Sequence, residues 1–192
     1  MLKRKLIDRL DSLRQLSKAY RSFLEEDHSY RYRLITRGSL LLSPGKKANE
    51  LHFIGRGLFK LYYLRDSGEE QQLDFFTDGD FMMLPVDFYD DTDNFRYYIK
   101  ALEPGEILSI YKRDMDLIYK RFPEARDHTD LIRSEISLSI TAHVDLLLIR
   151  KEELFNECVK VKKEVCPRIS KQLMSNFLGI SKKSLERGRS SS

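Results

Sequence analysis

The hydrophobic positions divide the chain into three zones, and each zone predicts a different kind of element. Between Leu6 and Leu24 they recur every three or four residues, the period of an amphipathic helix. From Arg33 to Tyr111 they form short runs separated by glycine, proline and aspartate, as in strands joined by turns. Beyond Phe122 a helical period returns and continues toward the end of the chain.

The central zone predicts an antiparallel β-roll or jelly roll, because short strands alternate regularly with turn residues. With helices on both sides of it, the chain falls in the α+β class. We expect strands at about residues 34–42, 50–54, 57–64, 69–76, 96–102 and 107–111. We expect the core of this sheet structure to contain the aromatic residues Tyr62, Tyr63, Phe75, Phe76, Phe81 and Phe88.

A long helix is predicted to begin near Phe122-Pro123-Glu124, since proline is tolerated in the first turn of a helix. Apolar residues then recur along one face at spacings of four, four, four and three. So wide an apolar face predicts burial against the helix's own domain and against a second copy of the chain. A helix packed only within its own core is the alternative. The face consists of Ile132, Ile136, Ile140, Val144 and Leu147.

Residues 170–189, with the sequence SKQLMSNFLGISKKSLERGR, predict a helix-turn-helix motif. Gly179 supplies a tight corner between two short helices, and Ser181 can cap the second of them. Leu185 points inward on this second helix, while its exposed positions are basic. A basic second helix of this kind fits the major groove of DNA. The exposed basic residues are Lys182, Lys183 and Arg187.

Charge is segregated along the chain in a way that agrees with a nucleic-acid-binding end. The net charge is +4, but residues 150–192 carry 11 Lys and Arg against 5 Asp and Glu. Residues 25–149 carry 16 against 23, so the middle of the chain is acidic. We therefore expect the C-terminal segment to contact a polyanion.

The order of these parts resembles the Crp/Fnr family of homodimeric bacterial transcription regulators. The resemblance rests on the run FIGRGLFKLYYLRDSGEEQQLDFFTDGDF at residues 53–81 and on the LGIS corner at residues 178–181. It implies a helix and effector-sensing β-roll over residues 1–115, a dimerisation helix over 116–149 and a DNA-binding domain over 150–192. It further implies that Lys182, Lys183 and Arg187 contact bases, and that Ser170, Lys171 and Ser184 contact phosphates.

The effector pocket departs from the family members that bind cyclic AMP. Those carry a Gly-Glu pair followed by an Arg-Ser/Thr-Ala triplet, whereas here Gly79 is followed by Asp80. Phe95 takes the place of the arginine, Tyr97 that of the small residue, and Arg96 is one position late, facing the opposite side of a strand. Because bulky rings would fill the space of a phosphate, we expect a different small-molecule effector.

Two further departures concern DNA binding. Gly188 stands where the family usually has an apolar residue, and glycine weakens a helix by about 1 kcal/mol relative to alanine. The stretch from Val161 to Ile169 leaves no room for a β-hairpin wing. Both features predict DNA binding weaker than is typical of the family.

The sequence predicts neither a catalytic nor a metal centre, and no cofactor. The four histidines lack metal-ligand spacing, and Cys158 and Cys166 lie eight residues apart without a CxxC motif. Two reduced thiols, and the absence of any long apolar run, favour a cytoplasmic protein without membrane contact.

Three functions therefore compete. The favoured one is a homodimer that binds double-stranded DNA, with RNA polymerase as a further partner. The second is a ligand-sensing β-roll that acts through protein contacts, and the third is a jelly-roll enzyme.

Overall fold

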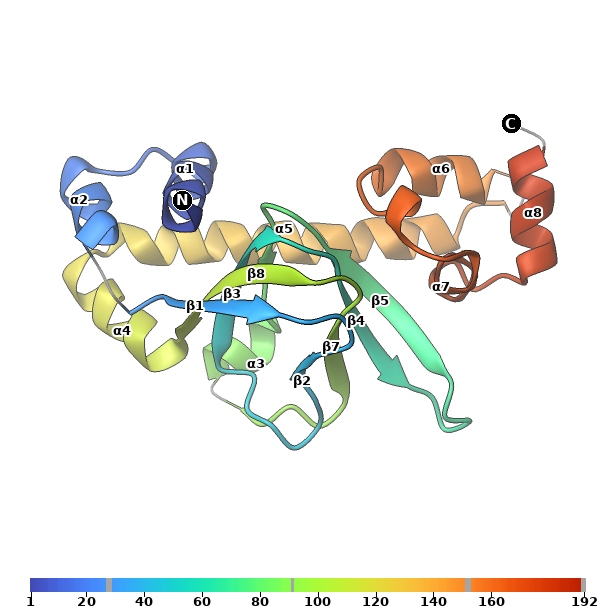
Figure 1. Cartoon of the computed structure of the whole chain (residues 1–192), viewed down its shortest axis with the longest axis horizontal. Coiled ribbons are helices and arrows are strands. Elements are labelled where there is room, and N and C mark those ends of the chain that lie inside the picture. The colour runs from blue at the N-terminus through green and yellow to red at the C-terminus, as the bar shows by residue number, and fades with distance from the viewer. Residues whose placement is uncertain (27–28, 91, 151–152, 191–192) are drawn as a thin grey trace.

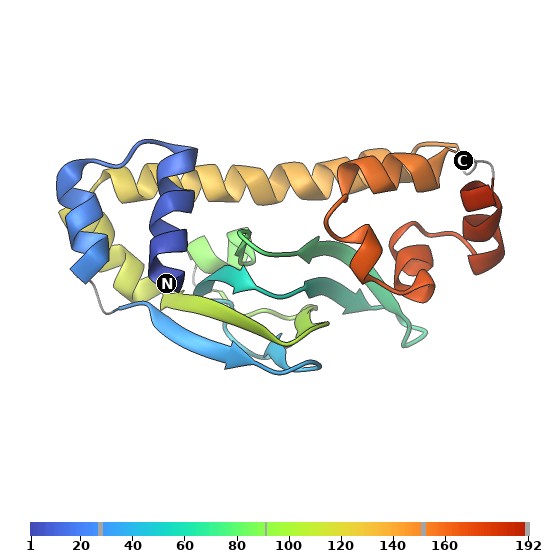
Figure 2. The same cartoon turned by 45° about the horizontal axis from the view of Figure 1, so that its top comes forward.

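The computed structural model describes residues 1–26, 29–90, 92–150 and 153–190, with side chains up to residue 187. A β-roll occupies the middle of the molecule, and the long helix α5 (Glu124–Leu147) runs alongside it (Figure 1). The N-terminal helices lie at one end of α5 and the C-terminal helices at the other (Figure 2). Helix α5 therefore connects the two ends of the molecule.

The β-roll consists of two four-stranded antiparallel sheets, which confirms the predicted class. The central strands β3, β4 and β8 carry runs of four or five consecutive buried residues, so both of their faces are covered. In spatial order the first sheet contains β1 (Arg31–Ile35), β8 (Gly105–Tyr111), β3 (Glu50–Arg56) and β6 (Phe81–Met82). The second sheet contains β2 (Leu40–Leu42), β7 (Tyr97–Ala101), β4 (Phe59–Leu64) and β5 (Glu70–Phe76).

Several boundaries differ from the predicted ones for local reasons. The strand predicted over residues 34–42 is two strands, β1 and β2, because Gly38 turns the chain with a φ of +89°. The first helical zone is also divided, into α1 (Leu2–Leu13) and α2 (Lys18–Glu26). Residue Arg14 adopts an extended conformation there, and the Tyr20 amide donates to Ser17 Oγ at 3.1 Å to start the second helix. The pattern missed β6, α3 (Pro85–Asp90) and α4 (Lys112–Arg121).

The aromatic residues predicted for the core are divided among three environments. Phe76, Phe81 and Phe88 lie in the core of the roll, as predicted. Phe75, the neighbour of Phe76 on β5, faces the other side of the sheet and belongs to a second cluster. Tyr62 stacks on Tyr98 with ring centroids 5.0 Å apart, and Tyr63 is half-buried.

The predicted apolar face of α5 is buried in its own domain over part of its length, as expected, and is exposed over the rest. Ile132 and Ile136 are buried in the core of the roll, and Ile140 packs at its edge. Val144 and Leu147, by contrast, are 51% and 46% exposed. The 100° rotation per helical residue places Val144 about 80–120° around the helix from Ile136 and Ile132, whereas Leu147 stays on their side and is exposed at the C-terminal end of α5.

The C-terminal unit is a compact group of short helices. The helical period that continues beyond α5 corresponds to the short helix α6, which spans Leu154–Val161. It is followed by the 3₁₀ turn η1 (Cys166–Arg168), α7 (Lys171–Phe177) and α8 (Lys182–Ser190). Residues 153–190 contain no strand, in agreement with the predicted absence of a β-hairpin wing. Among the helices that the structure describes, none combines the length and apolar character needed to cross a bilayer.

Candidate DNA-binding and sensor sites

Helices α7 and α8 form the predicted helix-turn-helix. Gly179 turns the chain between them with a φ of +62°, a left-handed conformation that favours glycine. Met174, Phe177 and Leu178 are buried beneath the corner. Ser175 is also buried, and its hydroxyl donates to the Gln172 carbonyl at 2.9 Å, so a small residue is required here. The corner is therefore rigid and well packed.

Helix α8 presents a basic surface, as the sequence predicted. Ser181 caps its N-terminus by accepting a hydrogen bond from the Ser184 amide at 3.1 Å. Leu185 is 1% exposed and anchors the inner face. Lys183 and Arg187 are one turn apart on the opposite side of the helix, and both are exposed. Lys182 is exposed in the first turn.

The residues expected at phosphates have structural roles as well. Ser170 is exposed and caps α7, since its Oγ accepts from the Leu173 amide at 3.2 Å. Lys171 Nζ lies 2.9 Å from Glu186 Oε1, an exposed ion pair that joins α7 to α8. The Ser184 hydroxyl lies 3.0 Å from that of Ser181. These side chains are thus positioned by the motif itself.

Helix α5 carries a second apolar stripe on its solvent-facing side, which continues to Leu148 just after its end. Leu131, Leu138 and Leu148 are 37%, 68% and 81% exposed. With Ser134 and Thr141 between them, positions 131, 134, 138 and 141 alternate at spacings of three and four, which is a heptad pattern, and Asp145 takes the next position before Leu148. Both hydroxyls donate to carbonyls of their own helix, at 2.9 and 3.0 Å. This stripe is suited to packing against another helix.

The helix-turn-helix packs directly on the β-roll through Phe177. Its ring lies edge-on to Phe75 of β5, with centroids 5.1 Å apart, and stacks on His143 of α5 at 3.8 Å. His143 Nε2 contacts the Phe177 carbonyl oxygen at 2.7 Å. Burial lowers the pKa of His143, so the imidazole is neutral and donates to that carbonyl. Three elements thus meet at one ring.

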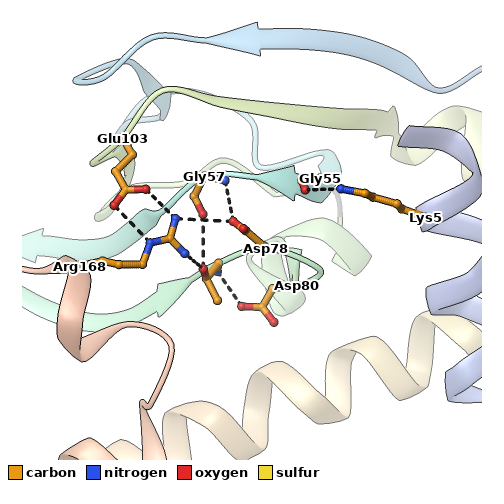
Figure 3. A network of polar contacts seen from close by, with 8 residues as sticks. Lys5, Gly55, Gly57, Asp78, Asp80, Glu103 and Arg168 are labelled. Atoms are coloured by element: carbon orange, nitrogen blue, oxygen red, sulfur yellow. Dashed lines mark hydrogen bonds and ion pairs between the residues drawn. The ribbon is translucent and has the colours of Figure 1, made fainter. Parts of the chain in front are cut away.

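Arg168 ties the C-terminal unit to two acidic loops of the roll (Figure 3). Its guanidinium makes a bidentate contact to Glu103, with Nη2 2.6 Å from Oε2 and Nε 3.2 Å from Oε1. It also reaches Asp78 Oδ1 at 3.6 Å and donates to the Thr77 hydroxyl. The hydrogen bonds from Arg168 lower the pKa of Glu103, which keeps this pair ionised.

Lys162 forms a second and more deeply buried link. Its ammonium pairs with Asp74 of β5 and donates to Ser139 Oγ of α5 at 2.6 Å. The Lys162 side chain is 10% exposed and that of Asp74 is fully buried. Removing one charge from such a pair leaves the other buried and unpaired, which is strongly destabilising. The contact between the roll and the C-terminal unit is therefore both apolar and ionic.

The structure does not bring the expected effector-pocket residues together. Gly79 and Asp80 follow the end of β5 that pairs Phe76 with Phe59, whereas Tyr97 pairs with Tyr63 at the opposite end of β4. The remaining two residues of the set point outward. Phe95 is 81% exposed, and Arg96 stacks its guanidinium over the Tyr63 ring at 4.1 Å.

Asp80 instead lines a cleft of about 280 Å³ between the roll, α5 and the segment after α6. Burial raises the pKa of Asp80 to about 6, although its Oδ2 accepts a hydrogen bond from the Thr77 amide at 2.7 Å. Most of the cleft is apolar, with Lys162 and Ser139 among its polar residues. The cleft thus lies where the roll meets the C-terminal unit.

Sequence reasoning missed Lys162 and Arg168, and it assigned no partner to His143. Their partners lie far away in the chain. Lys162 contacts residues 23 and 88 positions away, Arg168 contacts residues 65 and 91 positions away, and His143 contacts Phe177, 34 positions away. Nothing in the local pattern marks such partners. The heptad of α5, however, was visible in the sequence as Leu131 and Leu138, seven residues apart. Among the described residues, no group of three or more histidine, cysteine or acidic side chains is arranged to hold a metal ion.

Comparison with known proteins identifies the same architecture. Residues 32–122 match the cyclic nucleotide-binding domain family. FixK2 from Bradyrhizobium japonicum superimposes with a TM-score of 0.67 at 15% identity, covering 84% of this chain and 83% of that one. No curated protein shows significant sequence similarity to the chain.

Two other solved structures agree. The catabolite activator protein of Thermus thermophilus has a TM-score of 0.58 at 16% identity, covering 95% and 85% of the two chains. A putative cAMP-binding regulatory protein from Silicibacter pomeroyi has a TM-score of 0.62 at 21% identity, covering 98% and 87%. Residues 32–122 are therefore similar to the cyclic nucleotide-binding domain family, and the chain as a whole shares the fold of these solved proteins.

Proposed function

We propose that this chain is a homodimeric, sequence-specific DNA-binding transcription regulator of the Crp/Fnr type that acts without catalysis. The observation that carries the proposal is helix α8, which is capped by Ser181, anchored by Leu185 and basic on its outer side. Such a helix matches the width and the charge of the DNA major groove.

Base recognition is assigned to Lys182, Lys183 and Arg187. Arg187 has the geometry for a bidentate contact to guanine, worth about 1–3 kcal/mol of discrimination. The lysines act on base edges or phosphates. Ser170, Lys171 and Ser184 contact phosphates at the edge of the groove, which sets the register of the motif without reading sequence.

Dimerisation is assigned to the outward stripe of α5, namely Leu131, Leu138 and Leu148 with the small residues between them. Exposed leucines at heptad spacing are stabilised when a second helix covers them. Two recognition helices would then read two half-sites about one turn of DNA apart.

The effector is a small molecule other than cyclic AMP, because Phe95, Arg96 and Tyr97 lie apart from Gly79 and Asp80 and do not form one phosphate-binding pocket with them. We assign it to the cleft lined by Asp80, since a ligand there would bear on both the roll and the segment that leads to the helix-turn-helix. RNA polymerase is a further expected partner.

Selection of random duplexes by the full chain tests the DNA-binding proposal. We expect enrichment of a motif with two-fold symmetry. Arg187→Ala should relax the preference at one base pair per half-site, whereas Lys171→Ala should weaken all sequences alike and lower the salt dependence. If no symmetric motif is enriched, a ligand-sensing protein that acts through protein contacts takes its place. The engagement of Lys171 with Glu186 is the observation that favours this second function.

Light scattering tests the interface. Leu138→Asp should yield monomers, because it places a charge in the outward stripe. Arg133→Gln, exposed on α5 but about 140° around the helix from Leu138, is the control and should leave the mass unchanged. An unchanged mass for Leu138→Asp would exclude this interface.

A further inference from the structure

The two cysteines of the chain meet inside the C-terminal unit. Cys158 lies in α6 and Cys166 begins η1, and the turn between these elements folds back so that their sulfur atoms are 3.7 Å apart. The Cys166 thiol also lies 3.6 Å from the Cys158 carbonyl oxygen, to which it can donate. Two thiols in contact are the geometric requirement for an intramolecular disulfide.

Their surroundings distinguish the two thiols. Cys158 is 1% exposed and Cys166 is 9% exposed. A hydrogen bond from Cys158 and the nearby Lys162 ammonium lower the pKa of Cys166, whereas the same contact and burial raise that of Cys158. Since the thiolate is the nucleophile, Cys166 is the more reactive sulfur and also the more accessible one.

We propose that Cys158 and Cys166 form a peroxide-responsive dithiol. The Cys166 thiolate attacks one oxygen of hydrogen peroxide, the O–O bond breaks, and hydroxide leaves and takes a proton to become water. Cys166 is then a sulfenic acid. The Cys158 sulfur attacks the Cys166 sulfur, the S–O bond breaks, and a second water leaves with the Cys158 proton. Overall, two thiols are oxidised to a disulfide and one peroxide is reduced to two waters.

The dithiol is joined through the backbone to the link between the roll and the C-terminal unit. The Lys162 amide donates to the Cys158 carbonyl at 2.8 Å, and the Lys162 carbonyl accepts from the Cys166 amide at 2.9 Å. The side chain of the same residue pairs with Asp74 and Ser139. Because a disulfide bond measures about 2.05 Å, its formation draws α6 and η1 together around Lys162. Oxidation therefore alters the contact that Lys162 makes between the C-terminal unit, the β-roll and α5.

Whole-protein mass spectrometry tests the chemistry on the reduced full chain, freed of reductant and treated with equimolar hydrogen peroxide. We expect the loss of two hydrogen atoms, no labelling by N-ethylmaleimide, and full recovery of both thiols with dithiothreitol. Cys158→Ser should stop at the sulfenic acid, which dimedone traps on Cys166. Cys166→Ser should react with peroxide at least tenfold more slowly than Cys158→Ser.

Three results would overturn the proposal. The first is that both thiols remain open to alkylation after peroxide treatment. The second is a disulfide between two chains on a non-reducing gel. The third is that the two single variants react equally fast with peroxide. Hydrogen exchange in α7 tests the mechanical link, with the Cys158→Ala/Cys166→Ala double variant as the control. Peroxide should change exchange only in the natural chain, and no change there would refute the link. None of these measurements requires DNA, so their failure is separate from that of the proposed function.

Discussion

The two hydrophobic clusters of the molecule differ in where their side chains come from. The larger cluster collects residues from α1, α2, the roll, α4 and the first half of α5. The smaller cluster takes Leu58 and Phe75 from the roll and completes them with side chains of the C-terminal helices, including Phe177 and Leu185. The helix-turn-helix therefore shares its core with the β-roll. A domain boundary near residue 150 would separate the motif from Leu58, Phe75 and Leu146, which belong to the same cluster.

This difference indicates how the β-roll and the C-terminal unit are mechanically coupled. A domain with its own complete core can move as a rigid body on a linker, but a domain that shares a core must expose apolar surface to move. Phe177, Lys162 and Arg168 connect the two parts by different forces. The following changes separate these contributions, from the largest expected effect to the smallest.

Phe177→Ala should have the largest effect, because the ring is fully buried between the roll, α5 and α7. We expect a loss of about 4 kcal/mol in unfolding free energy. Hydrogen exchange should accelerate in α7 and α8 and change little in β3 and β8. Phe95→Ala, at a ring that is 81% exposed, is the control and should be nearly neutral. Equal acceleration in the roll would show that the two clusters form one cooperative unit.

Lys162→Met should cost about 3 kcal/mol in chemical denaturation, because it leaves the Asp74 carboxylate buried without its partner. Adding Asp74→Asn should recover most of that loss. Lys160→Met, in the last turn of α6 just before Lys162, breaks an exposed pair with Glu157 and should cost less than 1 kcal/mol. A double variant no more stable than Lys162→Met would show that the charge pair is not the cause.

Asp80→Asn should alter how stability depends on pH. Burial raises the folded pKa of Asp80 to about 6, so the stabilisation from its protonated form is complete below pH 3.8 and is lost as the pH rises through 6. The unfolding free energy of the variant minus that of the natural chain should therefore grow by about 2 kcal/mol from pH 4 to pH 7. Asp66→Asn, at an exposed turn, should show no such trend.

Ser170→Ala should have the smallest effect, about 1 kcal/mol, because it removes the cap of α7 and leaves both clusters intact. Thermal unfolding measures this loss. The DNA affinity of the variant, compared with that of the natural chain at one salt concentration, then shows whether the hydroxyl also contacts a phosphate. A fall in affinity larger than the stability loss accounts for would support that contact.

The sequence alone determined the elements whose signals are local. The capped basic helix around Lys183 and Arg187, the glycine corner at Gly179 and the antiparallel strands each follow from spacing within a few residues. Such patterns predict a structure because the interactions that stabilise turns and helix ends join neighbouring residues.

Only the tertiary structure decided which faces are covered. The period of α5 showed two apolar stripes, but the roll covers Ile132 and Ile136 and leaves Leu138 exposed. Phe75 and Phe76 are adjacent, yet they enter different clusters because successive strand residues face opposite sides. The Lys162–Asp74 pair spans 88 positions, and the two sulfur atoms meet only because the turn after α6 folds back. Contacts between distant residues depend on how elements pack, and local spacing carries no record of that packing.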